Sequence, residues 1–400
     1  MAISKWNKSP LKPLCNRIGD GLHGTPSYND ESDVFFINGN NLKNGSIVIS
    51  RETKKVTSSD FESNYIELNE NSLLLSINGT LGEMAFYNGE KVMLGKSAAY
   101  LNFKTGINRF YYYYFQLKGV QQYFYNVATG STIKNLGLKS IQDFEVPHPD
   151  EKEWQPIARF LSNLDKKIEL NNKINTELEA MAKLIYDYWF VQFDFPDANG
   201  QPYKSSGGKM VYNETLKREI PDGWDSDYVE HLLEKESRTK KLPKTNYKTE
   251  GTIPVIDQST DFICGYTDDE DTVITTEIPR IVFGDHTRIF KLVNFNFARG
   301  ADGTQVLLSN NKNVPQHYFY HSLLKIDLTN YGYARHFKFL KSTRIVVPSH
   351  KITCQFEEKV KSFYDQIRHN RFENTTLEEL RDWLLPMLMN GQVTVNDAPQ

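Results

Sequence analysis

The chain has 400 residues, more than one ordinary hydrophobic core organises, so two or more domains are expected. Its 39% hydrophobic and 24% charged residues are typical of a globular protein and argue against disorder. The net charge of −3 excludes a uniformly basic nucleic-acid binder, so any DNA surface has to be a local basic patch.

Cysteine usage and hydropathy indicate a cytoplasmic protein. Cys15, Cys264 and Cys354 are scattered and form neither a disulfide framework nor a metal-ligand spacing, so no metal site is expected. The N-terminus lacks an apolar signal core, and no run of about 18 apolar residues predicts a membrane span.

The first half of the chain reads as a mixed module followed by a long helix. Short β-like runs occupy residues 34–37, 47–50, 73–77 and 98–103, and an aromatic-rich helical stretch covers 110–125. Residues 157–190 carry apolar side chains at alternating steps of four and three, which predicts a helix with a heptad-type seam. Residues 194–223 are rich in Pro, Gly, Ser, Asn and Asp and predict a linker.

The second half repeats this order. β-like runs at 253–256, 280–283, 294–298 and 305–308 precede a helical stretch at 316–326, and residues 356–389 align with 157–190 without a gap. The paired seam positions are Ile157/Phe356, Leu161/Val360, Leu164/Phe363, Ile168/Ile367, Leu178/Leu377, Met181/Leu380 and Ile185/Leu384. Residues 130–147 match 332–348, and 6–28 resemble 224–247 with Trp6 opposite Trp224 and Tyr28 opposite Tyr247. Each module is therefore expected to be α+β rather than a parallel βαβ fold.

Four asparagines occupy seam positions in both helix copies: Asn171 and Asn175 in the first, Asn370 and Asn374 in the second. A buried Asn lowers stability but fixes the register and partner of a helix pair. The coincidence in both copies favours two helices that pack against each other. The alternative is that they are surface asparagines of frayed helices.

Catalytic motifs are missing. Gly95-Lys96-Ser97 has Glu90 where a phosphate-binding loop needs glycine, and no strand-bound glycine-rich cofactor loop or adjacent prolines occur. Glu52-Thr53-Lys54 reads as solvated edge-strand charge, and His286 after a Gly-Asp turn reads as a loop hydrogen-bond donor. No catalytic residue is therefore predicted.

Local basic residues are the candidates for DNA binding, because Lys and Arg neutralise phosphates while Arg, Asn, Gln, Ser and Thr reach base edges. The first module offers Arg17, His23, Thr25, Lys54, Lys96, Lys134 and Lys139. The second offers Arg238, Lys240, Lys241 and Lys244 in the basic segment 235–248, and Arg288, Arg299, Arg335 and Lys341. The alternative is that most of these are ordinary surface charges.

The duplication has a geometric meaning for DNA binding. A helix of 32 residues is about 48 Å long, and one turn of duplex is about 34 Å. The helices are thus long enough to place two modules about a turn apart on DNA. An antiparallel pair would give the single chain approximate two-fold symmetry, with two equivalent surfaces for two copies of a partner.

The order of module, long helix, module and long helix resembles the specificity subunit (HsdS) family of Type I restriction-modification systems, over nearly the whole chain. The phrases that carry the resemblance are Gly130-Ser131-Thr132, Leu138-Lys139-Ser140, Val146-Pro147, Leu161-Ser162-Asn163-Leu164-Asp165, Tyr188-Trp189-Phe190-Val191, Ile220-Pro221-Asp222-Gly223-Trp224, Gly332-Tyr333-Ala334-Arg335 and Leu384-Leu385-Pro386-Met387.

The resemblance implies two target-recognition domains, 1–150 and 221–350, that each read half of a bipartite site. Conserved helices at 151–197 and 351–397, with a linker at 198–220 between the first helix and the second domain, would form an antiparallel coiled coil that acts as the spacer ruler. It also implies double-stranded DNA, two methyltransferase subunits and two restriction-translocase subunits as partners. The chain itself would hold no cofactor, and S-adenosylmethionine, ATP and Mg²⁺ would belong to those partners.

Two other functions stay open. The chain could be a scaffold that binds protein and not DNA, against which the basic segment 235–248 argues. It could also be a self-sufficient nuclease or methyltransferase, against which the missing motifs argue.

Overall fold

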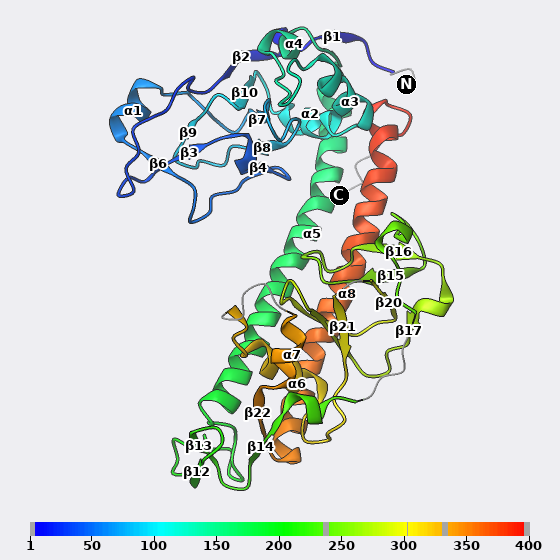
Figure 1. Cartoon of the computed structure of the whole chain (residues 1–400). Coiled ribbons are helices and arrows are strands. Elements are labelled where there is room, and N and C mark those ends of the chain that lie inside the picture. The colour runs from blue at the N-terminus through cyan, green and yellow to red at the C-terminus, as the bar shows by residue number, and fades with distance from the viewer. Residues whose placement is uncertain (1–4, 235–239, 302, 330–334, 396–400) are drawn as a thin grey trace. The chain divides into compact units, whose positions relative to one another are not determined.

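A computed structural model of the chain describes residues 5–234, 240–301, 303–329 and 335–395. It divides into two compact units, Met1–Glu169 with Asn374–Gln400, and Leu170–Glu373. Each unit contains one module and one half of each long helix (Figure 1).

The first module is built on an antiparallel sheet with strand order β2-β10-β7-β8. These strands are β2 (Cys15–Asp20), β7 (Ser72–Ser76), β8 (Met84–Phe86) and β10 (Ala98–Phe103). The remaining strands are β1 (Lys8–Pro10), β3 (Val34–Ile37), β4 (Leu42–Lys43), β5 (Ser46–Ile47), β6 (Lys55–Val56), β9 (Val92–Leu94) and β11 (Glu145–Pro147). Its helices are α1 (Ser58–Ser63), α2 (Asn108–Phe115), α3 (Lys118–Val127) and α4 (Leu138–Gln142), with 3₁₀ turns at Lys12–Leu14 and Gly39–Asn41.

Aromatic side chains of α2 form the centre of this module. Phe110, Tyr111 and Phe115 are completely buried, and the Tyr111 ring stacks on Phe103 of β10 at 5.2 Å. Burying each such side chain contributes roughly 1.5–3 kcal/mol. The same core includes Leu161 of the first long helix and Leu388 of the second, so the module is anchored on both helices of its unit.

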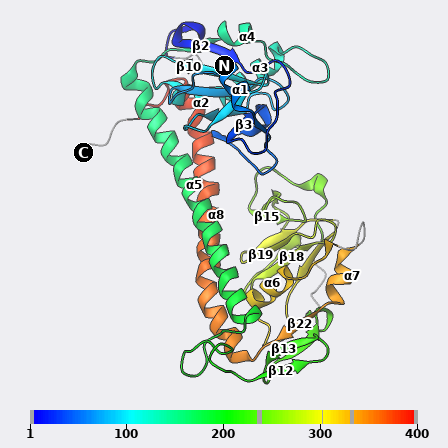
Figure 2. The same ribbon diagram turned by 90° about the vertical axis from the view of Figure 1, so that its left-hand side faces the viewer.

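The second module repeats this plan with the antiparallel order β19-β18-β21. These strands are β18 (Arg280–Gly284), β19 (Phe290–Val293) and β21 (Thr304–Leu307). The others are β14 (Asp225–Tyr228), β15 (Ile253–Ile256), β16 (Gly265–Thr267), β17 (Val273–Ile274), β20 (Phe297–Arg299) and β22 (Arg344–Val347). Its helices are α6 (Gln316–Leu324) and α7 (His336–Lys341), with 3₁₀ turns at Val229–Leu232, Lys244–Asn246 and Glu270–Thr272 (Figure 2).

The two modules share the central part of their strand order. β3 pairs parallel with β9, as β15 does with β20, and these are the parallel pairs among the described strands. β7 lies between β8 and β10, as β18 lies between β19 and β21. The first strand of each module pairs with its last, β1 with β11 and β14 with β22. The internal repeat is therefore a repeat of topology as well as sequence, and each module is mixed α+β as predicted.

The long helices are α5 (Glu151–Tyr186), which continues in a π-helical turn at Asp187–Val191, and α8 (His350–Met389). They pair antiparallel within each unit. In the first unit Arg381 donates to Asp165 at 2.9 Å. In the second, Asn370 donates to Asn175 at 2.8 Å, while the Tyr186 ring lies against Phe356.

The segment predicted as a linker contains structure of its own. β12 (Met210–Asn213) and β13 (Arg218–Pro221) form an antiparallel hairpin. Before it, the Phe195 ring stacks on both Tyr203 and Trp224 at 4.6 and 5.0 Å. The aromatic side chains of this segment therefore pack it against Trp224 of the second module.

Candidate nucleic-acid interface

The central strands of the first module end at one common side of the sheet. β10 pairs antiparallel with both neighbours, so that Ala99 lies opposite Asp20 and Ala98 opposite Ser76. The chain therefore leaves β2 and β7, and enters β10, at the same side. We call the loops gathered there the first edge, which comprises residues 20–28, 77–82, 94–97 and 129–135.

Backbone hydrogen bonds hold the loops of the first edge together. Lys96 N donates to Leu22 O at 3.0 Å, and Leu22 N donates to Leu94 O at 2.8 Å. Leu136 N donates to Ile77 O at 2.9 Å, which attaches the 129–135 loop. Because these bonds involve only backbone atoms, they do not depend on which side chains the edge residues carry.

Three predicted DNA-binding residues, His23, Thr25 and Lys96, are exposed on the first edge. His23 Nε2 lies 2.7 Å from the Asp20 carboxylate, which orients the imidazole. The bridge between Leu22 and Gly95 makes His23 and Lys96 neighbours. The structure thus brings together residues that are far apart in the sequence.

Two further predicted lysines lie over exposed aromatic rings. Lys54 Nζ is 4.4 Å from the centre of the Tyr28 ring, and Lys134 Nζ is 5.1 Å from that of Tyr125. Such cation–π contacts are worth about 0.5–1 kcal/mol at exposed sites. They hold each charge at the surface while its hydrogen-bond donors stay available to phosphate.

Arg17 and Lys139 lie beside the first edge rather than on it. Arg17 is on β2, with its guanidinium 5.6 Å from the ring centre of Tyr100 on the neighbouring strand. Lys139 is exposed on α4, which packs against β2. Both are compatible with phosphate contacts at the margin of a DNA footprint.

The second module forms an equivalent edge. Leu242 N donates to Arg299 O at 3.0 Å, and Ala301 N donates to Leu242 O at 2.8 Å. Asp285 N donates to Gly303 O at 2.7 Å. We call the loops held by these bonds the second edge, which comprises residues 240–247, 284–289, 299–301 and 335–336.

The predicted basic segment contributes three described lysines to the second edge. Lys241 and Lys244 are exposed. Lys240 Nζ instead donates to Asp269 at 2.8 Å, and this bond lowers the pKa of the Asp269 carboxyl. Lys241 and Lys244 are therefore the better phosphate ligands, because the Lys240 charge is already partly compensated. Arg238 lies outside the described residues.

The arginines of the second edge differ in availability. Arg335 is exposed, and Arg288 makes one long hydrogen bond, from Nη1 to Leu328 O at 3.5 Å. Arg299 donates to Thr304 O and is half-buried, so it supports the edge from within. Lys341 on α7 donates to Glu230 at 2.8 Å, away from these loops.

The four seam asparagines are buried in the helix pair. Besides the bond between Asn370 and Asn175, Asn171 Nδ2 donates to Glu373 at 2.6 Å in the second unit. These polar contacts replace apolar packing at the middle of the helices, and their role in fixing the register stays a prediction.

Outside the seam, both helices expose apolar side chains at repeat-related positions. Leu184 of α5 is 67% exposed and Trp383 of α8 is 66% exposed. Met181 and Leu380, one turn earlier, are exposed too. We call Met181 with Leu184 the α5 patch and Leu380 with Trp383 the α8 patch. Exposed apolar groups of this kind mark protein-interaction surfaces when they are contiguous.

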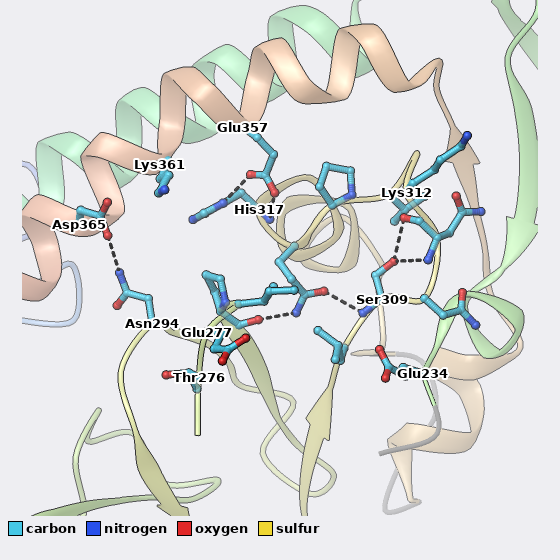
Figure 3. A pocket seen from close by; sticks show the side chains of 18 of the residues that line it. Glu234, Thr276, Glu277, Asn294, Ser309, Lys312, His317, Glu357, Lys361 and Asp365 are labelled. Carbon is cyan, nitrogen blue, oxygen red and sulfur yellow. Dashed lines mark hydrogen bonds and ion pairs between the residues drawn. The ribbon is translucent and has the colours of Figure 1, made fainter. Parts of the chain in front are cut away.

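The second unit also contains a cavity of about 770 Å³ between the second module and α8 (Figure 3). It lies where β18 begins and β21 ends, at the opposite end of that sheet from the second edge. Glu357 of α8 accepts hydrogen bonds from His317 N and Nδ1 at the start of α6. Asn294 Nδ2 donates to Tyr364 O at 3.1 Å. These bonds attach the second module to α8, so the cavity lies where the module packs on this helix.

Comparison with known proteins shows similarity to Type I restriction enzyme specificity subunits. A family model described as the Type I restriction modification DNA specificity domain matches residues 3–180. The MjaIX Type I restriction enzyme specificity subunit of Methanocaldococcus jannaschii is 26% identical over 312 residues, which are 73% of this chain and 70% of the relative. The chain is thus similar to Type I specificity subunits over most of its length.

A second curated specificity subunit and one solved structure are similar to the chain as well. The HindI specificity subunit of Haemophilus influenzae is 23% identical over 342 residues, which are 68% of this chain and 74% of the relative. The crystal structure of a Type-I restriction-modification system S subunit from M. genitalium has a TM-score of 0.61 at 17% identity, covering 100% of this chain and 98% of that one. This likeness shows a shared fold of two mixed modules and two long helices.

No helix in the described part of the chain combines the length and apolar character needed to cross a bilayer. Across the same residues, no three His, Cys, Asp or Glu side chains cluster as a metal site would require.

Sequence reasoning did not name Asn78 or Thr80, which follow β7, and it named His286, which follows β18, only as a loop hydrogen-bond donor. Asn78 and Thr80 lie on the first edge, while His286 lies on the second. Each follows a buried strand through a Gly-containing turn, which is a visible signal. Only the strand order, however, shows that these turns lie beside Lys96 and Arg335.

Proposed function

We propose that this chain is the DNA-recognition subunit of a Type I restriction-modification enzyme, and that each module reads one half of a bipartite duplex target. One observation carries the proposal: two modules with the same backbone hydrogen-bond pattern each present an exposed, partly basic edge with different side chains. A common frame with unlike surfaces fits two half-sites of different sequence. Exposed lysines supply phosphate contacts, and the polar loop residues reach base edges.

The same proposal assigns partners. Two methyltransferase subunits would dock on the α5 and α8 patches, because the duplicated helices offer the same kind of apolar surface twice. Two restriction-translocase subunits would join that assembly. S-adenosylmethionine, ATP and Mg²⁺ would act on those subunits, in the cytoplasm, while this chain contributes recognition and no catalysis.

Genome-wide mapping of methylated positions in cells that carry the chain and its partner subunits tests this function. We expect one bipartite motif, two defined half-sites separated by an unspecified spacer. The assembled complex should bind a duplex with that motif, and binding should weaken steeply as salt rises. Failure to bind at low salt would favour the scaffold function. Methylation or cleavage by the purified chain alone would establish a self-sufficient enzyme.

A further inference from the structure

The loops after β7 and β18 occupy equivalent places in the two modules. Ile77 N donates to Ser97 O at 3.0 Å, just as Asp285 N donates to Gly303 O. Leu136 N donates to Ile77 O, just as His336 N donates to Asp285 O at 3.2 Å. Each loop is therefore fixed from both sides by matching backbone bonds. We call residues 77–82 the first reading loop and residues 285–289 the second.

The side chains of the two reading loops differ completely. The first carries Asn78 and Thr80, and the second carries His286 and Arg288. Within the described part of the chain, the Asn78 amide has no hydrogen-bond partner. Two loops with the same backbone hydrogen bonds but different polar side chains are suited to the recognition of different base pairs.

The second reading loop holds its side chains in a defined arrangement. His286 N donates to the Gln258 side chain at 3.1 Å. Gly303 has a φ of +71°, and a Cβ there would lie 2.6 Å from His286 Cδ2, so the imidazole packs against a position open only to glycine. Arg288 adopts a φ of +62°, which is rare for a residue with a side chain. Arg288 is exposed, and its Nη1 makes a long hydrogen bond of 3.5 Å to Leu328 O.

Base-edge chemistry distinguishes the two loops. An Asn amide matches the N6 donor and N7 acceptor of adenine, while an Arg guanidinium matches O6 and N7 of guanine. The general phosphate contacts do not need Arg288, because Lys241, Lys244 and Arg335 supply exposed charge on the same edge.

We propose that Asn78 reads an adenine in the half-site of the first module and that Arg288, supported by His286, reads a guanine in the half-site of the second. This assignment rests on the proposed function. It adds the specificity-determining residues and the base that each one recognises.

Methylation mapping of variants in the full enzyme tests the assignment. Arg288→Lys keeps the charge and loses the planar fork, so a phosphate ligand would tolerate it, while a guanine reader would lose the fixed bidentate geometry and part of its stringency. We expect Arg288→Lys and Arg288→Ala to relax one G·C position in one half-site by about 10- to 100-fold, because a bidentate pair discriminates by about 1–3 kcal/mol. Asn78→Ala should relax one A·T position in the other half-site only.

Lys312→Ala is the matched control, because Lys312 is an exposed cation beside the cavity at the opposite end of the same sheet. It should leave the motif unchanged. Full stringency in Arg288→Lys, or relaxation of both half-sites by one substitution, would overturn the assignment while leaving the proposed function intact. Absence of any bipartite motif with the unmodified chain would overturn both.

Discussion

A buried asparagine in a helix seam exchanges apolar packing for one directed hydrogen bond. Asn175 and Asn370 form such a pair, and Gln366 Nε2 also donates to Asn370 Oδ1 at 2.7 Å. A neighbouring turn shifted by one residue would leave these amides facing apolar side chains. We therefore predict that the pair disfavours wrong alignments of the helices more than it stabilises the right one.

Replacing one member of the pair should lower the free energy of unfolding more than replacing both members. Asn370→Leu leaves the Asn175 carbonyl buried without its donor, at a cost of about 1–3 kcal/mol in the free energy of unfolding. The double change to Leu should recover most of that loss. Urea unfolding of Asn370→Leu, Asn175→Leu and the double variant measures both effects. A double variant whose loss of stability equals the sum of the two single losses would contradict the pairing.

His321 is a buried histidine that stays neutral. Burial lowers its pKa to about 3, and nearby His317, Lys325 and Lys183 act in the same direction while Asp187 opposes them. Its Nε2 lies 2.9 Å from the Tyr364 hydroxyl. Because the unfolded chain takes up this proton near pH 6.5 and the folded chain does not, stability is lost as pH falls below about 6.5.

His321→Gln should remove this part of the acid sensitivity. Between pH 7.5 and 5.5, His321 alone should reduce the free energy of unfolding by about 1.4 kcal/mol. Urea unfolding at both pH values should therefore show a smaller acid-induced loss in His321→Gln than in the unmodified chain. Equal losses in the two proteins would show that His321 takes up its proton in the folded state.

Exposed lysines of the second edge should set the salt dependence of DNA binding. Lys241→Ala with Lys244→Ala should reduce the slope of log affinity against log salt by about 2, and leave the sequence preference unchanged. Lys240→Ala should have a smaller effect, because Asp269 already pairs with Lys240. Titrations of the assembled complex at several salt concentrations measure these slopes. An unchanged slope in the double variant would place this segment away from DNA.

Among the elements, buried strands were the easiest to predict. Runs at 34–37, 98–103 and 253–256 coincide with β3, β10 and β15, since each is a short apolar run bounded by turn residues. The aromatic stretch 110–125 is instead two helices, because Leu117 adopts an extended conformation with a ψ of 130°. Composition alone does not locate such a break. The strand predicted at 294–298 begins only at Phe297, because the side chain and backbone of Asn294 bond to α8.

The seam prediction was right for its first half and wrong at Met181 and Leu380, which are exposed. Asn175, Leu178 and Met181 are separated by two consecutive steps of three residues. Because three residues fall short of a full helical turn, the second step places Met181 outside the seam. Ala182 is the buried residue after Leu178, and Arg381 takes the corresponding place in α8, where it pairs with Asp165. The hydrophobic pattern favoured the larger side chains of Met181 and Leu380. The helical repeat instead places the small Ala182 and the charged Arg381 at these seam positions.

The α5 and α8 patches make a prediction about assembly. Leu184→Glu should weaken binding of one methyltransferase subunit about 10-fold or more, and Trp383→Glu should do the same for the other, since each would bury an unpaired carboxylate in an apolar contact. The chain's own stability should hardly change, because both side chains are largely exposed. Native mass spectrometry of the complex counts the bound subunits, with Lys173→Glu as an exposed α5 control. Full occupancy in the double variant would contradict docking at these patches.

At the scale of the whole molecule, the sequence identifies the repeat and the basic residues but not the edges. Lys96 and His23, or Lys244 and Arg335, are brought to one edge only by strand order and backbone bonds between loops. Long-range pairing of this kind leaves no local pattern. The sequence also does not reveal that Lys240 and Lys341 already have acidic partners.

The helix pair makes a prediction about the target. One heptad inserted in each helix, at the level where Asn175 faces Asn370, lengthens the pair by about 10 Å. If the helices act as the spacer ruler, the unspecified spacer should grow by about 3 base pairs, with both half-sites retained. Methylation mapping of this variant reads the spacer directly. The original spacer at full efficiency would contradict the ruler.

Strand pairing at the boundary of each module has a genetic consequence. Because β1 pairs with β11 and β14 with β22, the chain enters and leaves a module at neighbouring points. A crossover between related genes within the stretches that encode α5 and α8 would exchange all strands and short helices of a module together. The repeated helices thus provide matched recombination sites, and a cell could acquire a new target sequence in one genetic event.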